Sequence, residues 1–205
     1  MNFLAHSVLA GEEPQIVLGS LIGDFIKGVL QPDQLPPSVL TGVRLHRRID
    51  AFSNQLPELK RSTTRLPERL RRYAPPCIDV IADHFLAEKM QADAEQFSDY
   101  RTWLYELALG EGQLHAPSSR DFFDRAQAAD LFAGYADWPV CARTVKHVCS
   151  RMPATKLGPE LGDLMVRELQ PQLKALRTDF DAYWPLLVEH AQAFLTTAHR
   201  NGRSS

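Results

Sequence analysis

Apolar residues recur at helical spacing along most of the chain. In residues 77–89, for example, Ile78, Ile81, Ala82 and Phe85 stand three or four apart or adjacent, as on the buried face of an amphipathic helix. No segment alternates apolar and polar residues with the period of two that a half-buried strand requires. We therefore expect an all-α fold, built as a single-domain multi-helix bundle.

Prolines divide this pattern into separate predicted helices. Pro36 and Pro37 suit the first turn of a central helix, and Pro67 interrupts a basic helical segment. Pro171 and Pro185 are expected to kink or divide the long C-terminal segment. The predicted helices cover residues 1–10, 14–28, 36–52, 58–72 in two parts, 77–89, 97–109, 119–135, 139–151 and 159–199.

Length and cysteine content narrow the class of protein. A chain of 205 residues can bury roughly 70% of the surface of its unfolded form. We expect one helical domain over residues 1–200 and a disordered tail at 201–205. The three cysteines lie far apart, without a CxxC pair, which indicates free thiols in a reducing compartment. No secretory leader or long apolar membrane segment is evident, so a cytoplasmic location is expected.

The central helix carries the first candidate site. His46 and Asp50 are four residues apart and so project from one helical face, flanked by Arg44, Arg47 and Arg48. An imidazole and a carboxylate can bind a divalent cation, and guanidinium groups match the oxygens of a phosphate. The alternative is a surface helix with a hydrogen-bonded histidine and an Arg–Asp pair.

Further acids and histidines occur in the N-terminal half. Asp24 is the only acid in an apolar run, and a buried carboxylate needs a compensating partner, so it is expected either to cap a helix or to meet a cation. Lys27, one turn later, could reach the same place. His6 lies on an apolar helix, where it is either a hydrogen-bonded core residue or a ligand. Asp83 and His84 form a second acid–histidine pair.

Together these residues predict a metal site. In helical proteins, divalent metals are held by side chains from facing helices. Mixed carboxylate and imidazole donors favour manganese, iron or magnesium over a thiolate-bound zinc. A metal with an open coordination position lowers the pKa of bound water and neutralises phosphate charge. The pattern therefore indicates hydrolysis of a phosphate ester.

A basic segment suggests a partner. Residues 58–72 contain six basic and two acidic residues, whereas the whole chain has a formal net charge of −2. Such a surface would attract an acidic protein or a nucleic acid and raise its encounter rate. The alternative is an ordinary solvated helix face.

Four short blocks stand out in the first 90 residues: MNFLAH at 1–6, GSLIGDFIKG at 19–28, GVRLHRRID at 42–50 and DHFL at 83–86. In this order they resemble the acyl carrier protein phosphodiesterase family. The resemblance implies hydrolysis of the phosphodiester between a carrier-protein serine and 4′-phosphopantetheine. It also implies manganese dependence and a distant, non-standard relation to the HD phosphohydrolases, hence an HD-domain-like fold.

The resemblance also assigns roles to residues. Its leading metal ligands are Asp24, His46, Asp83 and His84, followed by His6 and Asp50. Two positions depart from the family pattern, because Val8 stands where a histidine is expected and Ser20 where asparagine is common, so neither position is expected to be essential. The Asp-His order at 83 and 84 reverses the dipeptide of ordinary HD enzymes.

These expectations combine into one hypothesis. A Mn²⁺ ion, or else Fe²⁺ or Mg²⁺, activates water for in-line attack on the phosphodiester, and basic side chains stabilise the charge on the phosphate oxygens. The expected catalytic residues are Asp24, Lys27, Arg47 and Arg48. The expected docking residues for an acidic carrier protein are Arg44, Lys60, Arg61, Arg65, Arg69 and Arg72. We expect no nucleic acid and no membrane as partners.

Two other functions fit the same residues. One is an HD-type metal phosphohydrolase that acts on a small nucleotide or sugar phosphate. The other is a non-catalytic helical module that binds an acidic partner. Such a module would not need a stoichiometric metal ion. The number of metals, the acyl-chain preference and the oligomeric state are left open by the sequence.

Overall fold

The computed structural model describes residues 1–110, 117–152 and 157–202, and this part of the chain contains α-helices and short 3-10 turns but no strand. The all-α prediction is therefore confirmed. In chain order the elements are α1 (Phe3–Leu9), α2 (Pro14–Ile22), η1 (Gly23–Phe25), α3 (Pro37–Ser53), α4 (Pro57–Thr64), α5 (Glu68–Arg71), α6 (Pro75–Met90), α7 (Ala94–Gly110), α8 (Pro117–Ala128), α9 (Leu131–Gly134), α10 (Trp138–Ser150), η2 (Gly158–Glu160), α11 (Leu161–Leu169), η3 (Gln170–Gln172) and α12 (Leu173–Gly202).

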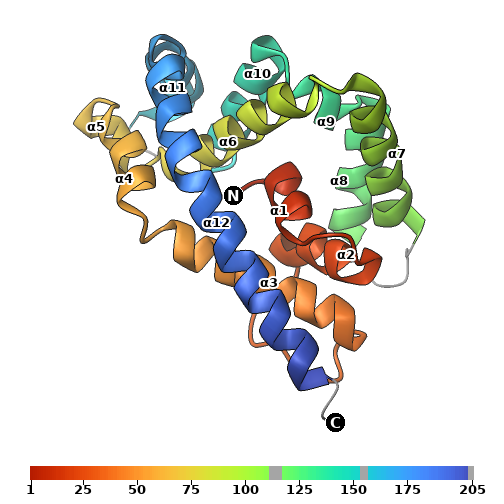
Figure 1. Ribbon diagram of the computed structural model, residues 1–205. Coiled ribbons are helices and arrows are strands. Elements are labelled where there is room, and N and C mark those ends of the chain that lie inside the picture. The colour runs from red at the N-terminus through yellow and green to blue at the C-terminus, as the bar shows by residue number, and fades with distance from the viewer. Residues whose placement is uncertain (111–116, 153–156, 203–205) are drawn as a thin grey trace.

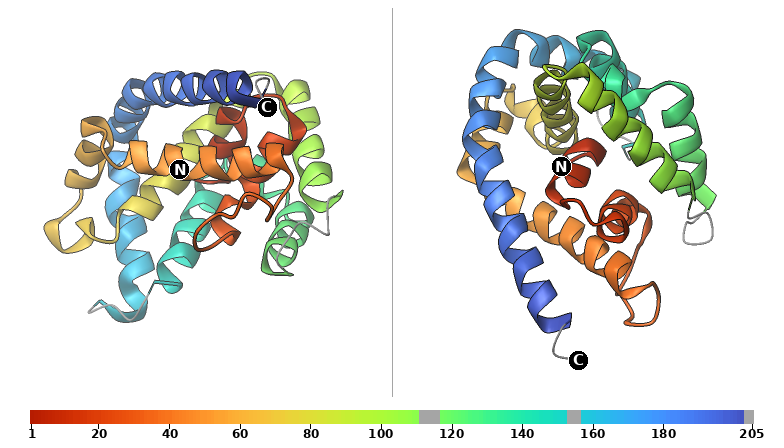
Figure 2. Two further views of the ribbon diagram at one scale, coloured as in Figure 1. Left: turned by 90° about the horizontal axis from the view of Figure 1, so that it is seen from below. Right: turned by 45° about the vertical axis from the view of Figure 1, so that its right-hand side comes forward.

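Helix α1 lies near the centre of the molecule. It packs against α2 and against α6, which pass on either side of it (Figure 1). Helices α4 and α5 lie at one side of the molecule and α7 and α8 at the other. Helix α12 crosses α4 and α6 and then runs alongside α3, as both views of Figure 2 show. Leu4 and Ala5 are fully buried, so the core surrounds the N-terminal helix.

The prolines act largely as predicted. The basic segment is divided before Pro67, because α4 ends at Thr64 and α5 begins at Glu68. Pro171 lies in the 3-10 turn that separates α11 from α12. Pro185, in contrast, lies inside α12 without ending it.

Three predicted boundaries differ from the structure. The segment 14–28 is helical only to Ile22 and continues as a 3-10 turn to Phe25, since the chain must turn before Gly28, which has a φ of +80°. The predicted helix 119–135 is divided at Asp130, whose φ of 41° is left-handed. Of the predicted tail, residues 201 and 202 belong to α12, and residues 203–205 lie outside the described residues.

Helices α2 and α3 approach each other unusually closely. A Cβ atom on Gly19 would lie 2.0 Å from the carbonyl oxygen of Val39, and one on Gly42 would lie 2.1 Å from that of Ile16. Only glycine permits this contact between two backbones. As a consequence, the end of α2 lies directly against the middle of α3, where the candidate site begins.

All three cysteines are buried as free thiols. The sulfur atoms of Cys77 and Cys149 are 3.6 Å apart. None of the helices described is long and apolar enough to cross a membrane.

Candidate active site

His46 is held in one orientation by the backbone of α2. Its Nδ1 atom lies 2.8 Å from the carbonyl oxygen of Ser20. Because a carbonyl can only accept, Nδ1 carries the hydrogen in this bond, which leaves Nε2 as the ring nitrogen that faces the acids. That Nε2 atom lies 3.4 Å from a carboxylate oxygen of Asp24 and 3.4 Å from one of Asp50.

Gly23 makes room for the His46 ring. A Cβ atom at this position would lie 2.4 Å from Cγ of His46, closer than any real contact. The turn that carries Asp24 can therefore lie against the imidazole. The GD pair at residues 23 and 24 thus serves two purposes, since the glycine admits the ring and the acid faces its Nε2 atom.

His6, from α1, completes the cluster. Its ring stacks on that of His46, with centroids 3.8 Å apart and an interplanar angle of 17°. Its Nε2 atom lies 3.1 Å from a carboxylate oxygen of Asp50, and its buried Nδ1 atom has no hydrogen-bond partner among the described residues. Burial, together with the neighbouring His46, lowers the pKa of His6 to about 3, so this imidazole is neutral at pH 7.

The two acids of the cluster are ionised. The contact with Nε2 of His46 holds the pKa of Asp24 below its ordinary value. Burial opposes ionisation of Asp50, but the bond with His6 and the positive α-amino group of Met1 hold its pKa low as well. The site therefore combines imidazole nitrogens with anionic oxygens.

This donor set fits a divalent cation. His6, His46 and Asp50 can each offer one ligand atom, and these atoms lie within 4.8 Å of one another. A neutral Nε2 lone pair that faces two carboxylates is repelled unless a proton or a cation lies between them. The Ser20 carbonyl fixes the ring of His46 in the way that a hydrogen-bond partner commonly orients a metal-binding histidine.

Asp79 adds a third carboxylate beside the cluster. The α-amino group of Met1 lies 3.0 Å from Asp50 and 3.3 Å from Asp79, which bridges the two acids. Burial opposes protonation of this amine, but the two acids raise its pKa to about 10, whereas burial raises the pKa of Asp79. Asp79 was not among the predicted site residues. Its position one turn before Asp83 on α6 is the only sequence signal that could have identified it.

Asp83 and His84 are placed elsewhere. Asp83 accepts hydrogen bonds of 2.9 Å from the backbone N–H groups of Leu4 and Ala5, at the start of α1. The nitrogen Nδ1 of His84 bonds to the carbonyl oxygen of Tyr135 at 2.7 Å. Neither residue joins the His6, His46 and Asp50 group among the described residues, because each bonds to the backbone of another segment. Their predicted role as ligands rests on the sequence alone, and Asp83 instead anchors the helix that carries His6.

The three basic residues predicted to be catalytic lie in different places relative to the cluster. Arg47 donates to the carbonyl oxygens of Gly28 at 2.8 Å and Ile26 at 2.7 Å, so it holds the loop that follows Asp24. Lys27 is exposed in that same loop. Arg48, in contrast, is two residues from both His46 and Asp50 and so lies on the opposite face of α3, beside Phe194. This position corrects the expectation that it faces the cluster.

The predicted docking residues fall into three groups. Lys60, Arg69 and Arg72 are exposed. Arg61 and Arg65 both bind the buried carboxylate of Asp179, at 2.7 and 2.6 Å, and so contribute to the packing of α4 on α12. The sixth, Arg44, lies on the opposite face of α3 from the cluster. The basic surface that remains for a partner is therefore smaller than the sequence suggested.

Comparison with known proteins gives consistent similarities. A family model described as acyl carrier protein phosphodiesterase matches residues 1–187. A protein of Escherichia coli O45:K1 (strain S88 / ExPEC) with that name is 41% identical over 194 residues, which cover 93% of this chain and 97% of the relative. One from Yersinia pestis, also so named, is 29% identical over 198 residues, covering 94% and 98%. No solved structure matches this chain.

Proposed function

Because this chain belongs to the acyl carrier protein phosphodiesterase family, we propose that it hydrolyses the phosphodiester that joins a serine of holo acyl carrier protein to 4′-phosphopantetheine. The products are apo carrier protein and free 4′-phosphopantetheine. The observation that carries this proposal is the convergence of His6, His46, Asp50 and Asp24 from α1, η1 and α3, within the stretch that the family model matches.

A divalent cation belongs to the proposal. His6, His46 and Asp50 would hold it, with Asp24 at the exposed side and Asp79 behind. Mixed nitrogen and oxygen donors of this kind suit Mn²⁺, Fe²⁺ or Mg²⁺, and the family resemblance favours Mn²⁺ among them. When bound, such an ion would lower the pKa of water and neutralise charge on the phosphate.

The side chains around the cluster would carry the remaining steps. Asp24 is half-exposed and ionised, so it can orient the attacking water and accept its proton. Attack on phosphorus in line with the serine oxygen breaks the P–O bond to the carrier, and the serine oxygen gains a proton as it leaves. Lys27 lies three residues after Asp24 and is exposed, so its side chain would contact the phosphate oxygens. Arg47 positions this loop through the carbonyls of Gly28 and Ile26.

Docking and location complete the proposal. An acidic carrier protein would dock on the exposed basic residues Lys60, Arg69 and Arg72, with weaker contributions from Arg61 and Arg65, whose charges Asp179 partly neutralises. We place the reaction in the cytoplasm, because three buried free thiols suit a reducing compartment.

The test is direct. Holo acyl carrier protein is incubated with the enzyme and Mn²⁺, and the mass of the carrier is measured. Loss of 4′-phosphopantetheine is expected, and a chelator should stop it. Asp50→Asn removes a ligand charge and should reduce release by more than about 100-fold, whereas Asp99→Asn, at an exposed position on α7, should leave it unchanged. Normal release by Asp50→Asn in the presence of chelator would overturn both the site and the metal.

A further inference from the structure

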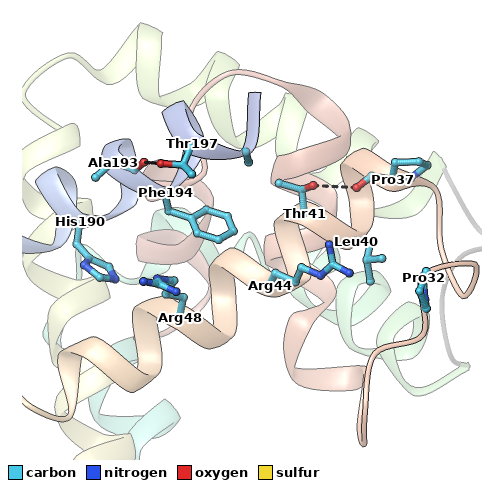
Figure 3. A pocket seen from close by; sticks show the side chains of 11 residues that line it. Pro32, Pro37, Leu40, Thr41, Arg44, Arg48, His190, Ala193, Phe194 and Thr197 are labelled. Carbon is cyan, nitrogen blue, oxygen red and sulfur yellow. Dashed lines mark hydrogen bonds between the residues drawn. The ribbon is translucent and has the colours of Figure 1, made fainter. Parts of the chain in front are cut away.

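A hollow lies on the face of α3 that is turned away from the His–Asp cluster. It has a volume of about 680 Å³ and lies between α3 and the C-terminal half of α12 (Figure 3). Leu40, Thr41, Arg44 and Arg48 line it from α3, and His190 and Phe194 line it from α12. Since Arg44 and Arg48 are two residues on either side of His46, this groove and the cluster occupy opposite faces of one helix.

The groove concentrates positive charge without an acid to balance it. Arg44 and Arg48 stand one helical turn apart, and among the described residues neither guanidinium has an ion-pair partner. Like charges at this spacing destabilise a helix. Arg61 and Arg65, which are also one turn apart, share the carboxylate of Asp179. The pair in the groove lacks such an anion, and its geometry suits one supplied from outside.

The other groups in the groove favour an apolar ligand body over additional polar contacts. The ring of Phe194 lies 5.9 Å from Cζ of Arg48. The hydroxyl of Thr41 donates to the carbonyl of Pro37 and that of Thr197 to the carbonyl of Ala193, so both hydrogens are already used within their own helices (Figure 3). Apart from the two arginines, the lining of the groove is therefore mainly hydrocarbon.

His190 adds a neutral polar atom at one end. Its ring stacks on Phe52, with centroids 4.0 Å apart and an interplanar angle of 2°. Its Nε2 atom is buried and has no hydrogen-bond partner among the described residues. Burial and the nearby Arg48 lower the pKa of this histidine, so it is uncharged at neutral pH. The positive charge of the groove thus comes from the two arginines.

We propose that this groove binds an organic phosphate monoester, with the phosphate on Arg44 and Arg48 and an apolar body along Leu40 and Phe194. Paired guanidinium groups match phosphate oxygens. The volume is in the range of small-molecule sites and far exceeds what an inorganic anion fills. The released 4′-phosphopantetheine is a phosphate monoester whose gem-dimethyl group, next to the phosphate-bearing carbon, can lie along Leu40 and Phe194, and its choice as the ligand rests on the proposed function. The groove would then retain the product on the side of α3 opposite to the catalytic cluster.

Titration calorimetry tests the proposal on the full chain. The probes are 4′-phosphopantetheine, pantetheine without phosphate, and inorganic phosphate, each added to the wild type and to Asp50→Asn. We expect both proteins to bind 4′-phosphopantetheine with similar affinity, and both other probes to bind at least tenfold more weakly. The double variant Arg44→Ala and Arg48→Ala should weaken binding at least tenfold, and Phe194→Ala severalfold.

Matched controls separate the alternatives. Arg125→Ala with Arg143→Ala removes two exposed arginines from another surface, on α8 and α10, and should leave the affinity unchanged. Circular dichroism confirms that each variant is folded. Equal affinity for inorganic phosphate would mean an unspecific anion contact and overturn the proposal, as would binding that is lost in Asp50→Asn but kept in the arginine variant. Neither result bears on turnover of the carrier protein, which the mass measurement tests separately.

Discussion

At the scale of single residues, the candidate site depends on how His46 is oriented. The Ser20 carbonyl fixes which nitrogen carries the hydrogen, and Gly23 leaves the space that the ring occupies. His46 can serve as a ligand here because the Ser20 carbonyl of α2 orients its ring and Gly23 of η1 leaves room for it.

Gly23→Ala should therefore damage the site and spare the fold. The backbone at this position is right-handed (φ −52°, ψ −38°), so alanine is sterically allowed there, but its Cβ atom would displace the His46 ring. We expect release of 4′-phosphopantetheine to fall by about 100-fold, measured on holo carrier protein, with unchanged helicity. Gly110→Ala is the control, because a Cβ atom there meets none of the described residues within 4 Å. Full activity in Gly23→Ala would mean that the ring orientation is unimportant.

Asp83 affects stability through its proton. Burial raises its pKa to about 7, although the N–H groups of Ala5 and Leu4 oppose this. The unfolded value is about 3.9, so the folded state binds the proton more tightly. Its contribution to stability is fully present below about pH 4 and is lost as the pH rises through about 7.

Asp83→Asn should remove this pH dependence, because an amide does not titrate. In the wild type, Asp83 contributes a fall in the free energy of unfolding of up to about 1.4 kcal/mol per pH unit between pH 4 and 7. Urea unfolding with a chelator present, measured across this range, should give a flatter profile for the variant. Parallel profiles for the two proteins would show that Asp83 does not hold a proton in the folded state.

At the scale of elements, two kinds of contact hold neighbouring helices together. Glycines at 19 and 42 let the backbones of α2 and α3 meet, which brings Ser20 to His46. Between α4 and α12 the contact is polar, since the buried Asp179 receives bonds from Arg61, Ser62 and Arg65. The first contact needs the absence of side chains, whereas the second needs several charged groups at once.

Asp179→Asn should loosen α12 from α4. Breaking a buried ion pair typically costs about 3 kcal/mol, and we expect a loss of that order in the free energy of unfolding at pH 7. Burial opposes ionisation, but the bonds from Arg65, Arg61 and Ser62 lower the pKa of Asp179. Its contribution is therefore present above about pH 3.9 and is lost as the pH falls through its lower folded value.

The difference between Asp179→Asn and the wild type should thus shrink toward pH 3, as measured by denaturant unfolding. Asp181→Asn, two residues later on the exposed side of α12, is the control and should change little at either pH. A difference that stays constant from pH 7 to pH 3 would mean that the charge of Asp179 is not what holds the two helices together.

At the scale of the whole molecule, charge is unevenly distributed. The chain has a net charge of −2, yet the segment from Glu58 to Arg72 is basic and lies over α4 and α5 at one side of the molecule (Figure 1). Such a field acts mainly on the rate at which an acidic partner arrives. Since the proposed catalytic cluster lies on α1, η1 and α3, away from this segment, docking and turnover should be separable by mutation.

Reversing charge with Arg69→Glu and Arg72→Glu should raise the KM for carrier protein severalfold and flatten its salt dependence, with a smaller effect on kcat. Steady-state kinetics at two salt concentrations measure both. Arg125→Glu with Arg143→Glu makes the same change in net charge at exposed positions on α8 and α10 and serves as control. If both pairs raise KM equally, overall charge rather than this surface governs docking.

Much of the fold could be read from local patterns. Helical periodicity predicted the order of helices, and Pro67 and Pro171 marked real divisions, because both effects act within a few residues of the chain. The left-handed Asp130 was missed. The freed N–H of Phe132 just beyond it is satisfied by the hydroxyl of Tyr105, a contact between distant segments that no local pattern records.

The sequence by itself determined which residues share a helical face, and so it placed His46 with Asp50 and singled out Asp24 and His6 as candidates. Only the tertiary structure decided which faces meet. It turned Asp83 to the start of α1, turned Arg48 to a groove against α12, and brought Asp79 beside the cluster. The physical reason is that spacing along a helix fixes relative direction, whereas the partner of each side chain depends on packing between segments that are far apart in the chain.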